Sequence, residues 1–220
     1  TMMDYAIDAN DASIFEDVPN DHYAKDYIMA AYRNNLIAKS DKFRPDEYIT
    51  QGELCKMIIY AFGYGDIAEQ YHSWRKGTSE VSSYLDLLKY VNCNFDDQLN
   101  RGLTAQIIFN ALKAPLKGLA FSDGYNKIVM EAPSEYSLYS LYGMKIYEGI
   151  VTQNSASTLT HPTDKRENHI MIDNMAFSDG DGLMQKMLGK KAGVLVDEND
   201  KVVAGYEDTL INETTRVYDS

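Results

Sequence analysis

Residue types that could bind metals or act as nucleophiles are present but scattered along the 220-residue chain. No H-E-x-x-H or other metal-ligand spacing connects the four histidines, His22, His72, His161 and His169. Cys55 and Cys93 form no C-x-x-C pair, so no zinc or redox motif is indicated. A G-x-S-x-G elbow and a Gly-rich phosphate loop are also missing from the sequence. We therefore predict a protein that is not an enzyme, with no catalytic residue, no metal site and no cofactor.

Two short acidic segments could offer oxygen ligands to calcium. They are SDGDGL at residues 178–183 and DEND at residues 197–200, and neither has the spacing of an EF-hand loop. Asp and Gly are also the residues that tight turns require. We favour this second interpretation for both segments.

Composition narrows the class of protein. Hydrophobic residues make up 45% of the chain and charged residues 25%, which is typical of a globular protein. The net charge of −12 would repel phosphate backbones, which argues against nucleic acid as a partner. No apolar run approaches the roughly 18 residues of a membrane span.

One stretch of sequence occurs twice, fifty positions apart: ITQGELCKMIIYAF at residues 49–62 and LNRGLTAQIIFNAL at residues 99–112. The first copy predicts a helix that begins with a capping box between Thr50 and Glu53. Its apolar stripe, ended by Gly63, comprises Leu54, Met57, Ile58, Ala61 and Phe62. In the second copy Asn100 is the predicted cap and Pro115 ends the helix.

A further helix is predicted before each copy. The first runs from about residue 23 to 36 after Asn20 or Asp21 as cap, and the second covers residues 79–91. Each unit therefore consists of a helix, a loop and a helix. A pair of helices cannot bury both faces alone, so such units are expected to stack.

Residues 15–53 resemble an S-layer homology domain, whose pattern runs F-x-D-V, H-W-A, a helix, F-x-P and I-T-R-A-E. The matching positions are Phe15, Asp17, Val18, His22, Ala24, Phe43, Pro45, Ile49, Thr50 and Glu53. Residues 66–116 resemble a degenerate second unit that ends LNRGLTAQIIFNALKAPL. The resemblance implies a helical domain, residues 1–116, with units at about 15–64 and 66–116.

In this family the domains bind secondary cell-wall polysaccharide, often pyruvylated, in grooves between units. The arginine of T-R-A-E contacts the acidic sugar, and a guanidinium fork suits that carboxylate. Carried over, this position is Gln51 in the first unit and Arg101 in the second. The glycan-binding residues that the resemblance implies are thus Gln51, Arg101, the aromatic Tyr23 and the hydroxyl acceptor Asp17. Gln51 is neutral, so it cannot pair bidentately with a carboxylate, and Asp17 could instead serve a turn.

The second half changes to short alternating runs separated by Gly, Asp and Asn, which predicts a β-rich module over residues 124–220 after a linker near 117–123. Helices are predicted within residues 134–143 and 182–189. Strands are predicted at 144–154 and 167–177, in a hairpin around 197–200, and at 216–220. GIVTQN, IMIDN, MLGKKAGVLV and KVVAGYED are similar to a module that follows S-layer homology pairs in secreted clostridial proteins. We expect a partly open β-barrel, so the fold class is α+β.

The resulting hypothesis is a non-catalytic, secreted protein held in the cell wall or S-layer of a Gram-positive bacterium by binding secondary cell-wall polysaccharide. An alternative is that the fold no longer binds glycan and serves adhesion or self-assembly, through contacts with its own copies or with other surface proteins. A hydrolase whose catalytic part lies outside these 220 residues would need further sequence.

Overall fold

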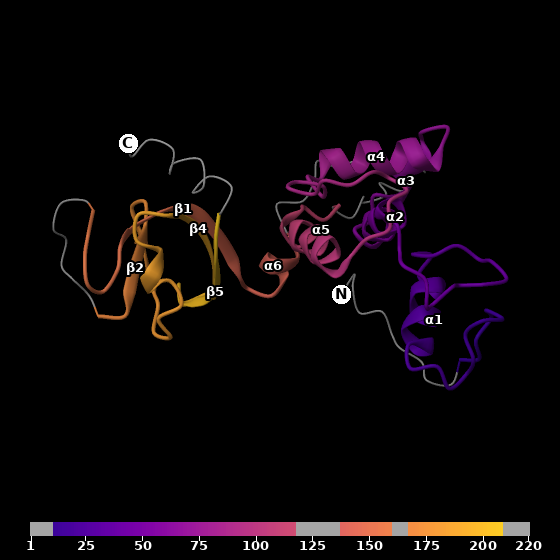
Figure 1. Cartoon of the computed structure of the whole chain (residues 1–220), viewed down its shortest axis with the longest axis horizontal. Helices are drawn as coiled ribbons and strands as arrows, with labels where there is room; N and C mark the ends of the chain where they lie inside the picture. Colours follow the sequence, from indigo (N-terminus) through magenta and orange to yellow (C-terminus); the bar gives the residue numbers. More distant parts are fainter. Residues whose placement is uncertain (1–10, 118–136, 160–166, 209–220) are drawn as a thin grey trace, which may run out of the picture. The chain divides into compact units, whose positions relative to one another are not determined.

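A computed structural model describes residues 11–117, 137–159 and 167–208. The chain divides into two compact units, residues 1–137 and 138–220, which we describe separately (Figure 1). Helices α1 to α5 lie in the first unit and the sheet lies in the second, so the predicted α+β class is confirmed. Within the described residues, none of the helices has the length and apolar composition needed to span a lipid bilayer.

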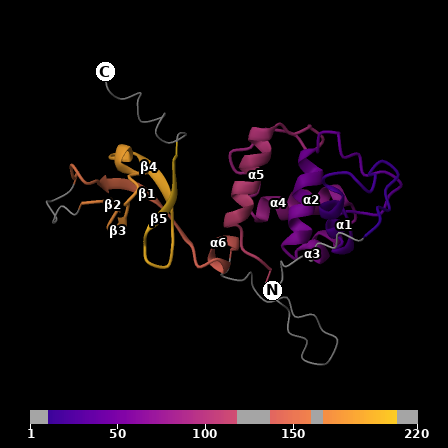
Figure 2. The ribbon, with the colours of Figure 1, turned by 90° about the horizontal axis from the view of Figure 1, so that it is seen from below.

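The first unit is helical. Its helices are α1 (Lys25–Arg33), α2 (Gln51–Ala61), α3 (Gly65–Glu69), α4 (Trp74–Tyr84) and α5 (Arg101–Lys113). Helix α2 contacts α3, α4 and α5, and these four helices lie together in Figure 2. The two repeated stretches therefore form α2 and α5, which are in contact with each other.

Both repeated helices begin as predicted. Thr50 Oγ1 accepts a hydrogen bond from the Glu53 N–H at 3.3 Å, and Glu53 Oε2 accepts one from the Thr50 N–H at 2.9 Å, which completes the capping box. At the start of α5, Asn100 Oδ1 accepts the N–H of Leu103 at 2.9 Å. Side-chain caps thus fix the first turn of each helix.

The helices that precede the repeated stretches differ from the prediction. Helix α1 begins only at Lys25 and has no side-chain cap, because its N-cap residue is Ala24. The predicted cap Asn20 instead accepts a hydrogen bond from the Ser13 N–H. The helix predicted over residues 79–91 is α4, which begins five residues earlier and ends at Tyr84. The chain turns after it because Asp86 and Tyr90 have positive φ angles. Helix α3 was not predicted, since five residues are too few to show a periodic pattern.

The buried face of α2 is rotated from the predicted apolar stripe. The most buried positions of α2 and its C-cap are Gln51, Gly52, Cys55, Ile59 and Phe62, of which only Phe62 belongs to the predicted stripe. Leu54 and Ile58 of the predicted stripe are only partly buried, against a cluster that contains Cys55, Leu99 and Ile107. Because α2 has neighbours on several sides, hydrophobic spacing alone did not identify its most buried face.

The second unit contains α6 (Leu138–Leu141), a 3₁₀ helix (Gln185–Met187) and an antiparallel sheet. The strands are β1 (Lys145–Gln153), β2 (His169–Ile172), β3 (Met175–Ser178), β4 (Lys191–Val196) and β5 (Val202–Glu207), in the order β3-β2-β1-β4-β5. The run predicted as one strand at 167–177 is a hairpin, with Asp173 and Asn174 between β2 and β3. We expected a partly open barrel, and the sheet is not closed: β3 and β5 are its edges. Among the described residues, one isolated bridge connects Ser178 to Lys201, the residue before β5.

The two acidic segments of this unit form turns. Asp197 Oδ1 accepts the N–H groups of Asn199 and Lys201, which closes the β4–β5 hairpin. Asp179 Oδ2 accepts hydrogen bonds from the Met184 N–H and the Gln185 amide. The strand predicted at residues 216–220 and most of the linker at 117–123 lie outside the described residues.

Candidate functional site

Residues 94–98, the segment that leads into α5, cover the start of α2. The N–H of Gln51 donates to the Asp97 carbonyl at 3.0 Å, and the N–H of Gly52 donates to the Phe95 carbonyl at 2.9 Å. The first amides of a helix have no partner within the helix itself. Here this 94–98 loop supplies the partners, so the first turn of α2 is closed to a ligand.

The side chains at this start are also covered. Gln51 is only 5% exposed. A Cβ at Gly52 would lie 2.2 Å from Cε1 of Phe95, so the phenyl ring occupies the space that a larger residue would need. The structure therefore places the predicted glycan contact Gln51 in the interior. The contact of Phe95 with the start of α2 was not predicted from the sequence. Gly52, where the family pattern has Ala, is the signal of such a close approach.

Asp17 organises the loop before α2. Its two carboxylate oxygens accept the N–H groups of Phe43 at 2.8 Å and Arg44 at 2.7 Å. Desolvation alone would raise the pKa of Asp17, but these backbone donors outweigh it and lower that pKa. Arg44 in turn donates to Glu53 Oε1 at 2.9 Å. Hydrogen bonds thus join the F-x-D-V, F-x-P and capping-box segments of the motif, and Asp17 has a structural role here.

Tyr23 and Arg101 are exposed. Tyr23 is 88% exposed and stacks on His22, with ring centroids 4.7 Å apart. Arg101 is the first residue of α5, and its guanidinium has no ion pair or hydrogen bond with any described residue. No hydrogen bond, ion pair or ring contact connects any two of the four predicted residues in the described part of the chain. Chemically, Tyr23 could stack on a sugar ring, and the planar guanidinium of Arg101 could donate two hydrogen bonds to a carboxylate.

Comparison with known proteins bears on this motif. Residues 14–55 match the model of the S-layer homology domain. A protein of Thermoanaerobacter kivui named "Cell surface protein" is 27% identical over 109 residues, which cover 49% of this chain and 14% of that protein. The chain therefore spans only a small part of that relative. No solved structure matches the chain.

Hydrogen bonds join the motif segments into one helical module. In it, α2 begins with a capping box, and Arg44 ties this capping box to the preceding loop. Residues 14–55 are an S-layer homology domain. The matched segment ends inside α2, so the second unit predicted at 66–116 stays a prediction.

Proposed function

We propose that this chain is part of a cell-surface protein that is attached to a bacterial cell wall through its S-layer homology domain, by binding secondary cell-wall polysaccharide. The observation that carries the proposal is the family match at residues 14–55. The name of the T. kivui relative supports the cell-surface location. In this proposal the chain is secreted by a Gram-positive bacterium and has no catalytic activity.

Two of the predicted residues suit direct contact with the glycan. Arg101 supplies a guanidinium with no partner among the described residues, and Tyr23 supplies an exposed aromatic face. Gln51 and Asp17 are left out of the proposed contact, because Gln51 is buried and Asp17 accepts two backbone hydrogen bonds.

The alternative is that the domain has become a structural module for assembly or adhesion. The covered start of α2 favours this alternative, because the position that contacts the acidic sugar in the family is here Gln51, which is neutral and buried. In that case the partners would be other copies of this chain or other surface proteins.

Co-sedimentation of the chain with purified, pyruvylated wall polysaccharide tests the proposal. We expect binding that Arg101→Ala weakens and that Gln51→Ala leaves unchanged. Failure to co-sediment, together with self-association under the same conditions, would favour the assembly alternative.

A further inference from the structure

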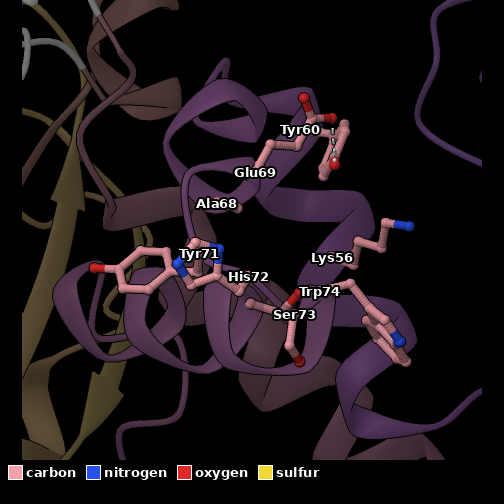
Figure 3. Close-up of a pocket in the computed structure, with 9 residues that line it drawn as sticks. Lys56, Tyr60, Ala68, Glu69, Tyr71, His72, Ser73 and Trp74 are labelled. Carbon is pink, nitrogen blue, oxygen red and sulfur yellow. Dashed lines mark hydrogen bonds between the residues drawn. The ribbon is translucent and has the colours of Figure 1, made fainter.

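A pocket lies between α2, α3 and α4, on residues that the predicted site does not include (Figure 3). Its volume is about 180 Å³. The lining combines aromatic, charged and hydroxyl side chains: Lys56, Tyr60, Glu69, Tyr71, Ser73 and Trp74 are among its members. An engineered cavity of about 150 Å³ holds one benzene ring, so this pocket has room for one six-membered ring.

Trp74 provides a supported aromatic wall. Its side chain is 52% exposed, while its ring packs on Phe95 with centroids 5.0 Å apart. The next residue, Arg75, holds Asp96 with two hydrogen bonds of 2.9 and 2.7 Å. The 94–98 loop that covers the start of α2 therefore also supports Trp74, which is positioned before any ligand arrives.

Lys56 extends between two rings of the pocket, as Figure 3 shows. Its Nζ lies 5.5 Å from the centroid of Tyr60 and 5.7 Å from that of Trp74. No carboxylate among the described residues forms an ion pair with it. The ammonium group thus lies within cation–π range of two rings, and no acid in the described part of the chain neutralises its charge.

The one acidic group of the lining already has a partner. The Tyr60 hydroxyl donates to Glu69 Oε1 at 2.8 Å (Figure 3). Burial, followed by the neighbouring Glu69 carboxylate, raises the pKa of Tyr60 to about 12, so this hydroxyl stays protonated and donates at neutral pH. Glu69 thus accepts its hydrogen bond from Tyr60, and it forms no ion pair with Lys56.

We propose that this pocket binds one six-membered sugar ring that carries a carboxylate, with the ring against Trp74 and the carboxylate on Lys56. A chain with a net charge of −12 repels anions in general, so an acidic sugar needs a local cation. Lys56 supplies that cation in the same helix whose first turn has the neutral Gln51. The inference rests on the proposed function and deepens it, because it assigns the acidic sugar to a place on this chain other than the motif residues.

Trp74 makes the inference directly testable, since it is the single tryptophan of the chain and it lines this pocket. We would titrate the 220-residue chain with glucuronate, and with glucose as the neutral ring of the same size. We expect a saturable change of fluorescence with glucuronate and at least about tenfold weaker binding of glucose, because a charge-assisted hydrogen bond is lost.

Three variants define the role of Lys56. Lys56→Met should weaken glucuronate binding about tenfold or more, whereas Lys56→Arg should largely keep it. Lys89→Met is the matched control, because Lys89 Nζ also lies over an aromatic ring, 5.3 Å from the centroid of Tyr90, but outside the pocket. Unchanged binding in Lys56→Met, or equal responses to glucose and glucuronate, would overturn the inference.

Titration with wall polysaccharide separates this inference from the proposed function. Polysaccharide that co-sediments with the chain without changing Trp74 fluorescence, and equally well with Lys56→Met, would contradict the pocket and leave wall attachment intact. A Lys56-dependent response to glucuronate without polysaccharide binding would contradict wall attachment and support the pocket.

Discussion

Gly52 and Phe95 are joined in two ways: the Gly52 N–H donates to the Phe95 carbonyl at 2.9 Å, and the Phe95 ring fills the space beside the glycine. This contact fastens the 94–98 loop to the start of α2. Through the ring contact between Phe95 and Trp74, the same loop also connects the covered start of α2 to the pocket.

Gly52→Ala should lower the free energy of unfolding by about 1–3 kcal/mol, because the added methyl group would overlap the Phe95 ring, which must shift to accept it. Urea denaturation followed by circular dichroism measures the change. Gly102→Ala, at the equivalent position of α5, is the matched control. It should change the free energy of unfolding little, since a Cβ at this position would meet only Asn100 Oδ1, at 3.3 Å.

The clash itself can be checked with a second substitution. Phe95→Ala removes the ring, so Gly52→Ala should cost much less in that background. Equal costs of Gly52→Ala with and without the ring would contradict the packing described for this loop.

The capping box should make stability depend on acid pH. Desolvation alone would raise the pKa of Glu53, but hydrogen bonds from Thr50 and Arg44 outweigh it and lower that pKa. The folded-state pKa thus lies below the unfolded value of about 4.3, so the contribution is complete above that pH and is lost as the pH falls through the folded-state pKa. Glu53→Gln should therefore cost about 1 kcal/mol at pH 7, and progressively less as the pH falls through the folded-state pKa of Glu53.

Measuring the free energy of unfolding of both proteins from pH 7 to pH 3 tests this dependence. Glu80→Gln changes an exposed glutamate on α4 and serves as the control that should show no such convergence. A constant difference between the original chain and Glu53→Gln across this range would refute the ionised capping box.

The two cysteines should react at different rates. Cys55 is 1% exposed, and burial raises the pKa of its thiol to about 11, whereas Cys93 is half-buried. Iodoacetamide at pH 8 should therefore label Cys93 first and reach Cys55 only as the unit unfolds, which peptide mass spectrometry would show. If Cys55 in the Cys93→Ser variant were labelled as fast as Cys93 is in the original chain, the packing described for α2 would be contradicted.

Local sequence signals predicted the parts of this fold that depend on neighbouring residues. The capping box at Thr50, the Asn100 cap and the β4–β5 hairpin follow from contacts a few residues apart, and all three are confirmed. The covered start of α2 depends on Phe95 and Asp97, more than 40 positions further along the chain, and no periodicity in the sequence reports such contacts. The pocket was missed for the same reason, since Lys56 and Trp74 come together only when α2 packs against α4.

The family pattern also predicted Arg101 and Tyr23, but their joint use in one site stays a prediction. The structure shows both side chains exposed and without mutual contact among the described residues. A pattern of motif residues identifies the domain because the motif ties its own loops together, as Asp17 does with Phe43 and Arg44. It does not say which surface the sugar contacts.

The most direct test of the central claim is calorimetric titration of the chain with purified, pyruvylated wall polysaccharide, compared with Arg101→Ala and Gln51→Ala. The account predicts binding that Arg101→Ala weakens about tenfold or more, through loss of a charge-assisted contact, and that Gln51→Ala does not change. Absence of binding at micromolar protein, or binding that Arg101→Ala leaves untouched, would contradict wall attachment by this domain.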